Sequence, residues 1–252
     1  MPDVLKFKII SSGSRGNSSI IWDSSDIIMI DCGITLKRYL GAVPSEIPSD
    51  ASRSLLVSHE HWDHASGVKL FTGRGKFDLY ARNKTLSAMG VAGYNIGDEI
   101  AIGNFRILAM PVPHDAADPV GFIIKWKNRK ITVVSDLGRV PDDLVENAMG
   151  SDLLAFEANH DVEMLKLGSY PENLKRRILS DMGHLSNEQS AEAVGRIVAP
   201  HTRVILTHIS QQNNTPETAI EAITSHLKNR GIRYRSISYA SQDSGSEVYE
   251  MY

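Results

Sequence analysis

Short apolar runs fill the first half of the chain, and each predicts a β-strand. The runs at 19–23 and 26–31 are rich in β-branched residues and are separated by polar residues, while residues 5–10 alternate more loosely. Residues 54–58 (SLLVS) form a continuous apolar run, which is typical of a strand buried on both faces. Further strands are expected at 105–112, 120–127 and 130–136, and the sequence KNRK predicts a hairpin between the last two.

The second half of the chain mixes strand and helix patterns. Strands are expected at 152–158, 203–210 and 232–238, and helices at 171–182, 186–199 and 215–231. Ser186 and Thr215 are predicted N-caps, Pro216 suits a first helical position, and Gly231 follows the expected helix end. Because strands and helices interleave throughout, the pattern predicts an α/β (α+β) fold in one continuous domain, residues 1–252, with helices covering sheets.

Composition narrows this picture only slightly. A chain of 252 residues with 42% hydrophobic and 23% charged residues is an ordinary globular protein with a sizeable core. The net charge of −3 creates no global positive field, although a local basic groove is compatible with it. One cysteine, Cys32, fits a reducing compartment. Lys6 and Lys8 interrupt the first apolar run, so we expect a cytoplasmic protein with no membrane partner; its oligomeric state is not readable from these numbers.

The densest group of chemically active side chains lies at residues 58–64, SHEHWDH. This stretch follows the expected buried strand directly and places His59, His61, Asp63 and His64 within six positions. In an extended segment His59 and His61 point to one side, and a helix expected from Asp63 would turn the chain there. Imidazole and carboxylate suit zinc, manganese or iron. Three of the nine histidines lie here, which favours a metal-binding loop over a polar surface loop.

Three later residues follow predicted strands and complete a set of possible metal ligands: His114, Asp136 and His208. Each alone is typical of an ordinary turn residue. Together with His-x-His-x-Asp-His, their order resembles the ligand pattern of the metallo-β-lactamase superfamily, and the resemblance covers essentially the whole chain. It implies a four-layer αββα sandwich with a two-metal site at one edge.

The resemblance also implies a role for each ligand. It assigns His59, His61 and His114 to a first ion, Asp63, His64 and His208 to a second, Asp136 to a bridge between them, and Asp31 to support of the histidine loop. The implied cofactors are two divalent metal ions, zinc by default and manganese or iron as alternatives. Two adjacent ions lower the pKa of a shared water and stabilise developing negative charge, so the implied reaction is hydrolysis.

Two further stretches, AFEANHD at 155–161 and SDMGHLSN at 180–187, bear on the bond that breaks. The alkoxide that leaves a phosphodiester benefits from a general acid, and a glutamate that orients an imidazolium can provide one. The stretches resemble those of ribonuclease Z-like phosphodiesterases, which implies that Glu157 orients His184 as the acid; Asp63 is counted with them as a catalytic residue. In the family's motif a histidine precedes the glutamate, whereas in this sequence His160 follows Glu157. The resemblance therefore assigns no role to His160.

The sequences SSGSRGNSS at 11–19, PHDA, GHLSN and THISQQNNTPE together resemble the YycJ/WalJ-like branch of these hydrolases. That resemblance implies a bacterial enzyme with DNA exonuclease activity. Only 21 residues separate His114 from Asp136, which leaves no room for the long tRNA-gripping arm of ribonuclease Z. The predicted partner is therefore a nucleic acid, DNA rather than RNA, or a small phosphodiester.

Two groups of residues are candidates for binding that substrate. Small polar residues of the 11–19 loop can bring backbone amides close to a phosphate, and a basic run before His184 can contact the nucleic-acid backbone. A plain surface turn and a solvated helix face are their alternative interpretations. The candidates are Ser12, Ser14, Asn17, Lys175, Arg176 and Arg177.

The leading prediction is a metal-dependent phosphodiesterase, most simply a DNA exonuclease, and two alternatives stay open. A small-molecule metallo-hydrolase, acting on a cyclic nucleotide, another small phosphodiester, a lactone or a thioester, would use the same ions without the basic run. A non-catalytic, metal-stabilised regulator is disfavoured because the ligand set is complete. The sequence does not decide metal identity or exonuclease polarity.

Overall fold

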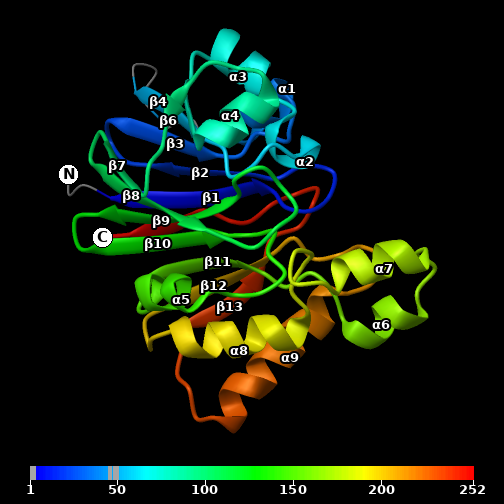
Figure 1. Cartoon of the computed structure of the whole chain (residues 1–252). Helices are drawn as coiled ribbons and strands as arrows, with labels where there is room; N and C mark the ends of the chain where they lie inside the picture. The colour runs from blue at the N-terminus through cyan, green and yellow to red at the C-terminus, as the bar shows by residue number, and fades with distance from the viewer. Residues whose placement is uncertain (1–3, 45–46, 48–50) are drawn as a thin grey trace. The chain divides into compact units, whose positions relative to one another are not determined.

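The computed structural model describes residues 4–44, 47 and 51–252, and these residues form two compact units (Figure 1). Unit 1 contains the described residues up to Ala109 together with 116–119 and 241–252, and unit 2 contains 110–115 and 120–240. The single domain over 1–252 stays a prediction. Within the described part of the chain, no helix has the length and apolar character needed to cross a membrane.

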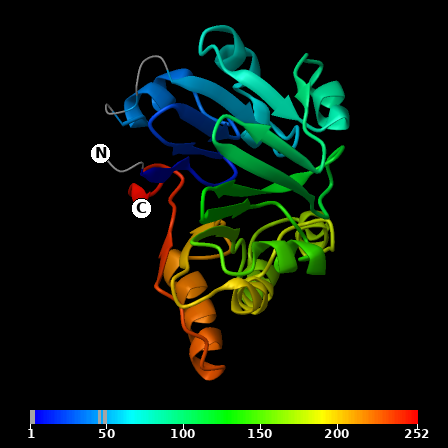
Figure 2. The same cartoon turned by 90° about the vertical axis from the view of Figure 1, so that its left-hand side faces the viewer.

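Unit 1 is built on a mixed sheet with the strand order β14-β1-β2-β3-β4-β5-β6. β1 pairs antiparallel with β2 and with β14, so the C-terminal strand lies beside the N-terminal one (Figure 2). From β3 to β6 neighbouring strands are parallel. The bounds are β1 (Leu5–Ser11), β2 (Ser18–Trp22), β3 (Asp26–Ile30), β4 (Ser52–Leu56), β5 (Asp78–Ala81), β6 (Tyr94–Asn95) and β14 (Tyr249–Met251).

Helices cover one face of this sheet and build the core of unit 1 (Figure 1). Tyr39 packs edge-to-face on Phe71 and Phe77, with ring centroids 5.4 and 5.6 Å apart. Trp22 and Met29 join the cluster from the strands. The helices are α1 (Leu36–Ala42), α2 (Trp62–Ala65), α3 (Val68–Gly73) and α4 (Asn83–Met89), and unit 1 also holds the antiparallel hairpin of β7 (Glu99–Ile102) and the start of β8 (Phe105–Pro111).

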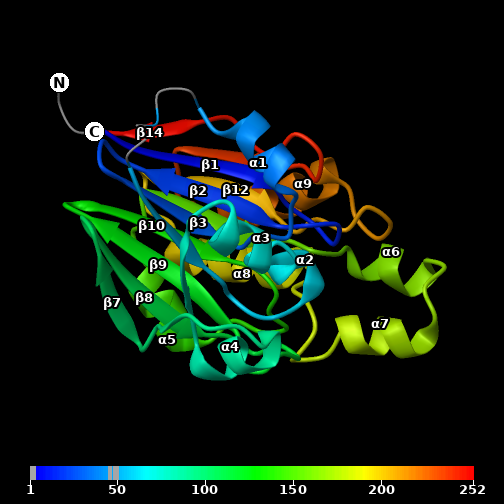
Figure 3. The ribbon, with the colours of Figure 1, turned by 90° about the horizontal axis from the view of Figure 1, so that it is seen from above.

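Unit 2 contains the strand order β13-β12-β11-β10-β9. β9 and β10 form the predicted hairpin, and β10 to β13 run parallel, which places their carboxyl ends at one edge. The buried faces of α5, α8 and α9 pack beside these strands, while α6 and α7 lie side by side (Figures 1 and 3). The bounds are β9 (Val120–Trp126), β10 (Arg129–Val134), β11 (Leu153–Glu157), β12 (Arg203–Thr207), β13 (Ser236–Tyr239), α5 (Asp142–Ala148), α6 (Val162–Leu167), α7 (Glu172–Ile178), α8 (Asn187–Ile197) and α9 (Pro216–Asn229).

The predicted capping signals are confirmed in unit 2. Ser186 and Gln189 form a capping box at the start of α8, and Thr215 caps α9 before Pro216. The strand predicted at 232–238 begins at residue 236, as β13, because the amide of Ile232 is still hydrogen bonded to a carbonyl of α9. Likewise the helix expected from Asp63 is two short helices that meet at Gly67, a residue that weakens a continuous helix.

Candidate metal-binding and acid–base sites

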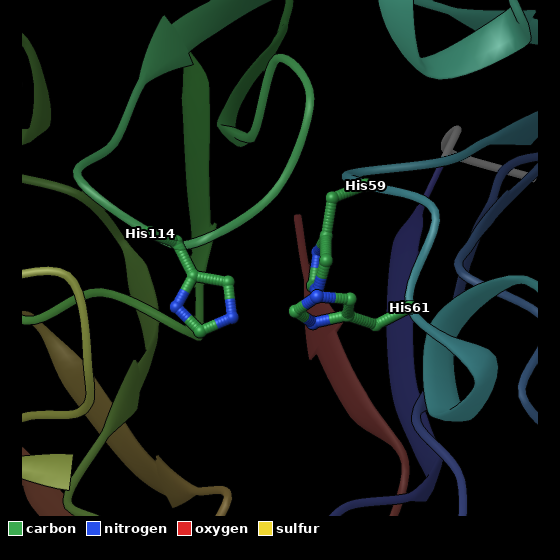
Figure 4. Close-up of side chains that lie close together, drawn as sticks. All are labelled: His59, His61 and His114. Carbon is green, nitrogen blue, oxygen red and sulfur yellow. The ribbon is translucent and has the colours of Figure 1, made fainter. Parts of the chain in front are cut away.

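The histidine loop of unit 1 follows β4 and brings three imidazoles together. His59 and His64 are buried, whereas His61 is half-buried. The ring of His59 lies 4.6 Å from that of His61 and 4.2 Å from that of His64, measured between centroids. Figure 4 draws His59 and His61 on this loop, together with His114, which belongs to unit 2.

Asp31, at the end of β3, holds this loop in place. Its Oδ2 accepts hydrogen bonds from His64 Nδ1 at 2.7 Å and from the Ser58 hydroxyl at 2.9 Å, and its Oδ1 accepts from the Ser58 amide at 2.8 Å. The Ser58 oxygen can then accept from His59 Nδ1, 3.0 Å away. In this tautomer both imidazoles carry the proton on Nδ1, which leaves the Nε2 lone pairs as acceptors that can bind a metal ion or, at His64, a hydrogen bond from Asn17. This is the supporting role that the family resemblance implied for Asp31.

The glycine-rich loop at 11–17 packs its backbone against the histidine loop. Asn17 donates from its amide nitrogen to His64 Nε2 at 2.9 Å and to Asp63 Oδ2 at 3.2 Å, and its backbone amide donates to the Asp63 carbonyl at 2.7 Å. A side chain at Gly33 would collide with that carbonyl. Of the three predicted phosphate contacts in this loop, Ser14 is exposed, whereas Ser12 and Asn17 are buried.

In unit 2 the candidate ligands lie within three residues after strand ends. His114 follows β8, Asp136 follows β10 and His208 follows β12. Asp136 and His208 adopt left-handed backbone angles, with φ of 58° and 52°, a conformation that non-glycine residues hold at a cost of about 1–3 kcal/mol and that clusters at functional sites. Asp136 Oδ1 lies 3.6 Å from His208 Nε2 and 4.0 Å from His114 Nε2.

The protonation of His114 suits a metal ligand. Its Nδ1 donates to the carbonyl of Gly183 at 3.1 Å, so Nε2 is the nitrogen directed toward Asp136. Burial lowers the pKa of His114, against the opposing charge of Asp136. The imidazole is therefore held in the neutral form that metals bind.

Glu157, at the end of β11, organises a second group of side chains in unit 2. Its Oε1 accepts from His184 Nδ1 at 2.7 Å and lies 3.4 Å from His208 Nδ1. Its Oε2 accepts from the amides of Leu137 at 3.1 Å and Leu185 at 3.4 Å. Burial opposes ionisation, but the charge of His184 and the hydrogen bonds from both imidazoles together lower the pKa of Glu157. It is therefore a buried carboxylate that orients two imidazoles.

Unit 2 offers a donor set that fits a divalent ion. Ligand atoms of Asp136, Glu157, His184 and His208 all lie within 4.8 Å of one another. The rings of His184 and His208 are stacked, with centroids 5.2 Å apart. Because both oxygens of Glu157 already accept hydrogen bonds from the protein, one of them from His184 Nδ1, we do not count Glu157 or His184 among the proposed metal ligands. The histidine and aspartate clusters of the chain are thus consistent with divalent-metal binding.

The three basic residues predicted on α7 differ in their contacts and in their exposure. Lys175 is buried, and its Nζ lies 2.7 Å from the Lys166 carbonyl and 3.1 Å from Glu172, which ties α7 to α6 (Figure 3). Arg177 makes a two-pronged ion pair with Asp115, at 2.6 and 2.9 Å. Arg176 is exposed. The burial of Lys175 contrasts with a fully solvated helix face.

Sequence reasoning missed Asn159, which supports His208. Its amide nitrogen donates to the His208 carbonyl at 2.9 Å and lies 3.1 Å from His208 Nδ1. Asn214 in turn donates to the Asn159 carbonyl at 3.2 Å. The only sequence signal was the place of Asn159 inside the stretch AFEANHD, two residues after Glu157.

Comparison with known proteins agrees with this chemistry. The sequence matches the family described as "Beta-lactamase superfamily domain" over residues 27–209. It is 33% identical over 239 residues to the "Exodeoxyribonuclease YycJ" of Bacillus anthracis, covering 90% of each chain. It is 35% identical over 238 residues to the "Exodeoxyribonuclease WalJ" of Streptococcus pneumoniae, covering 88% of each.

The fold agrees as well. The metallo-β-lactamase fold protein YhfI from Bacillus subtilis superposes with a TM-score of 0.75 at 15% identity, covering 98% of this chain and 100% of the other. The predicted α/β class with mixed sheets and helices is confirmed by this likeness. The chain belongs to the metallo-β-lactamase superfamily, as a hydrolase homologous to the YycJ and WalJ exodeoxyribonucleases.

Proposed function

We propose that this protein is a DNA exonuclease that hydrolyses phosphodiester bonds, with His184 as the general acid. The observation that carries the proposal is the pair of Glu157 and His184, in which a buried carboxylate accepts the Nδ1 proton at 2.7 Å. A partly exposed imidazole held in this way can deliver a proton from Nε2. The names of the relatives, both exodeoxyribonucleases, favour DNA as the substrate.

We further propose that the two units act as one domain, residues 1–252, because each carries only part of the ligand set that the family resemblance implies. The residues that would hold two divalent ions, zinc, manganese or iron, are His59, His61, Asp63, His64, His114, Asp136 and His208. Bound there, the ions would supply Lewis-acid stabilisation and a water nucleophile at neutral pH. Asp31 and the Gly183 carbonyl would keep the ligand imidazoles in the metal-binding tautomer.

The chain's own contribution to bond cleavage lies with Glu157 and His184. As the P–O bond to the leaving nucleoside breaks, His184 Nε2 donates its proton to the departing oxygen. The charge of Glu157 stabilises the protonated ring before this step and holds its orientation. The exposed Ser14, Arg176 and Arg177 remain the proposed phosphate contacts, with the buried Ser12, Asn17 and Lys175 supporting their segments.

The test compares wild type with His184→Ala on 5′- and 3′-labelled single- and double-stranded DNA, in zinc, manganese or magnesium. Wild type should shorten DNA stepwise, and the variant should lose about 100-fold or more in turnover while keeping its metal content. Bis-p-nitrophenyl phosphate should suffer much less from the substitution, because its leaving group needs little protonation. Full DNA turnover by His184→Ala would exclude His184 as the general acid. If wild type cleaves bis-p-nitrophenyl phosphate but no DNA, the proposed nuclease activity is excluded.

A further inference from the structure

Trp62 stands in the middle of the histidine loop, between His61 and Asp63, and its side chain faces solvent. It is 73% exposed, whereas the other two tryptophans, Trp22 and Trp126, are each only 2% exposed. An indole this exposed adds little to the core of unit 1, since apolar stabilisation scales with the area removed from water. Its position at the start of α2 (Figures 1 and 3) instead places it beside two proposed ligands.

The first groove that Trp62 lines has a volume of about 380 Å³ and carries positive charge. Arg15 and Arg38 line it, and Gly33 and Gly67 are among its small residues. Arg38 is held by the carbonyls of Ile10 and Asp243, at 3.2 and 2.9 Å, which leaves its charge uncompensated by those contacts.

Arg15 adds a second cation to this groove. Its ion pair with Asp243, at 3.1 Å, joins two exposed side chains. Such an ion pair is weak and screened by salt, so the guanidinium can exchange it for a phosphate.

A second groove, of about 360 Å³, is also lined by Trp62. Lys69 supplies a cation there, and Met89 and Val91 supply apolar contacts, next to the carboxylate of Glu60. An exposed indole with cationic side chains in both adjoining grooves is the combination that binds single-stranded nucleic acid, because the ring stacks on a base while the cations contact phosphates.

We propose that Trp62 stacks on a nucleobase at the end of the DNA substrate, with Arg15 and Lys69 contacting the flanking phosphates. This proposal rests on the proposed function and deepens it. The terminal base of a strand already exposes its outer face, so the indole can stack there without unpairing internal base pairs, and the substrate class is a DNA end rather than internal duplex. A second copy of this chain fits the surface less well, because it would bring the same cations together.

The test measures binding of the metal-loaded protein to a single-stranded oligonucleotide whose phosphorothioate linkages resist cleavage. A matched oligonucleotide lacks the bases of its terminal nucleotides but keeps their phosphates. Wild type should bind the base-bearing strand about 10-fold more tightly than the abasic one, and the strand should quench Trp62 fluorescence. Trp62→Ala should bind both strands equally, and Trp62→Tyr should restore part of the preference. Leu40→Ala, another exposed apolar side chain of unit 1, is the matched control and should behave as wild type.

Three outcomes would overturn the proposal. If Trp62→Ala keeps the preference for bases while wild type degrades DNA, stacking at Trp62 is wrong and the proposed function stands. If wild type cleaves no DNA with any metal, the proposed function fails and the stacking proposal fails with it. If wild type sediments as a dimer that Trp62→Ala dissociates, with no change in base preference, the indole belongs to an interface between copies.

Discussion

In each unit a buried carboxylate accepts a hydrogen bond from the Nδ1 of a histidine, but the two histidines differ in their exposure to solvent. In unit 1, Asp31 holds Nδ1 of His64, whose side chain is 0% exposed. In unit 2, Glu157 holds Nδ1 of His184, whose side chain is 12% exposed. Both carboxylates also accept backbone amides, so their own orientation is set by the fold.

Exposure separates these two histidines. A completely buried imidazole can give its Nε2 to a metal but cannot exchange protons with solvent, which suits a ligand. A partly exposed imidazole with an ionised carboxylate behind it can be protonated again after each turnover, which suits an acid. In the proposed function, the same kind of hydrogen bond would therefore support coordination in one unit and proton transfer in the other.

The largest effect is expected from the substitution Glu157→Gln. The amide keeps the size of the side chain but removes the charge beside the imidazole of His184, so DNA turnover measured at saturating metal should fall about 100-fold or more. Turnover of bis-p-nitrophenyl phosphate should fall much less, because its leaving group needs little protonation, and a merely structural role would reduce turnover of both substrates equally. Glu188→Gln, on an exposed position of α8, is the control. An equal loss on both substrates would exclude a role of Glu157 in proton transfer by His184.

The corresponding change in unit 1, Asp31→Asn, should act on metal instead of on proton transfer. The amide cannot accept all three hydrogen bonds that the carboxylate accepts, so metal affinity should fall about 10- to 100-fold. Competition with a chelator measures this loss. Asp23→Asn removes a buried carboxylate at the other end of β3, where it accepts the amides of Ser25 and Asp26, and should leave metal affinity unchanged. Equal losses in both variants would mean that Asp31 acts only on folding.

A smaller effect is expected at His160, a buried imidazole with no assigned proton-transfer role. Neither ring nitrogen makes a hydrogen bond to any described residue, and burial lowers its pKa to about 4. The unfolded chain, with a pKa of about 6.5, takes up the proton first as the pH falls. Stability from this residue is therefore present above pH 6.5 and is lost toward pH 4, by about 1 kcal/mol between pH 7 and 5.5.

Urea unfolding at the two pH values checks this expectation. His160→Gln should lose this part of the pH dependence, because its side chain does not titrate. The exposed His201→Gln should keep it. A pH dependence that persists unchanged in His160→Gln would contradict the assignment of the buried neutral imidazole.

The sequence predicted most of the strands and the histidine loop because their signals are local. An apolar run indicates a buried strand wherever it lies, and Ser186 and Thr215 each cap a helix through the residue three positions later. His59, His61 and His64 needed no tertiary information to be recognised as a group. The family pattern then connected them to the later strand-end residues, which no local signal could do.

The contacts between distant segments were beyond the sequence. Asn17 was a candidate phosphate contact, but its amide reaches Asp63, 46 residues away. Lys175 belonged to a basic run, but its ammonium is buried against α6. Neither the exposure of Trp62 nor the support of His208 by Asn159 follows from residue types. Each depends on which backbone passes nearby.

Local sequence patterns were thus enough to predict most of the strands, the kinds of donor atom and their order along the chain, because these depend on neighbours within a few positions. Which imidazole is buried and which is exposed to solvent depends on the three-dimensional fold. The same is true of which polar side chain hydrogen bonds to another. Burial and hydrogen-bond partners arise where parallel strands such as β10, β11 and β12 bring their carboxyl ends to one edge. There, residues separated by tens of positions acquire a common environment, and that environment sets their protonation and their role.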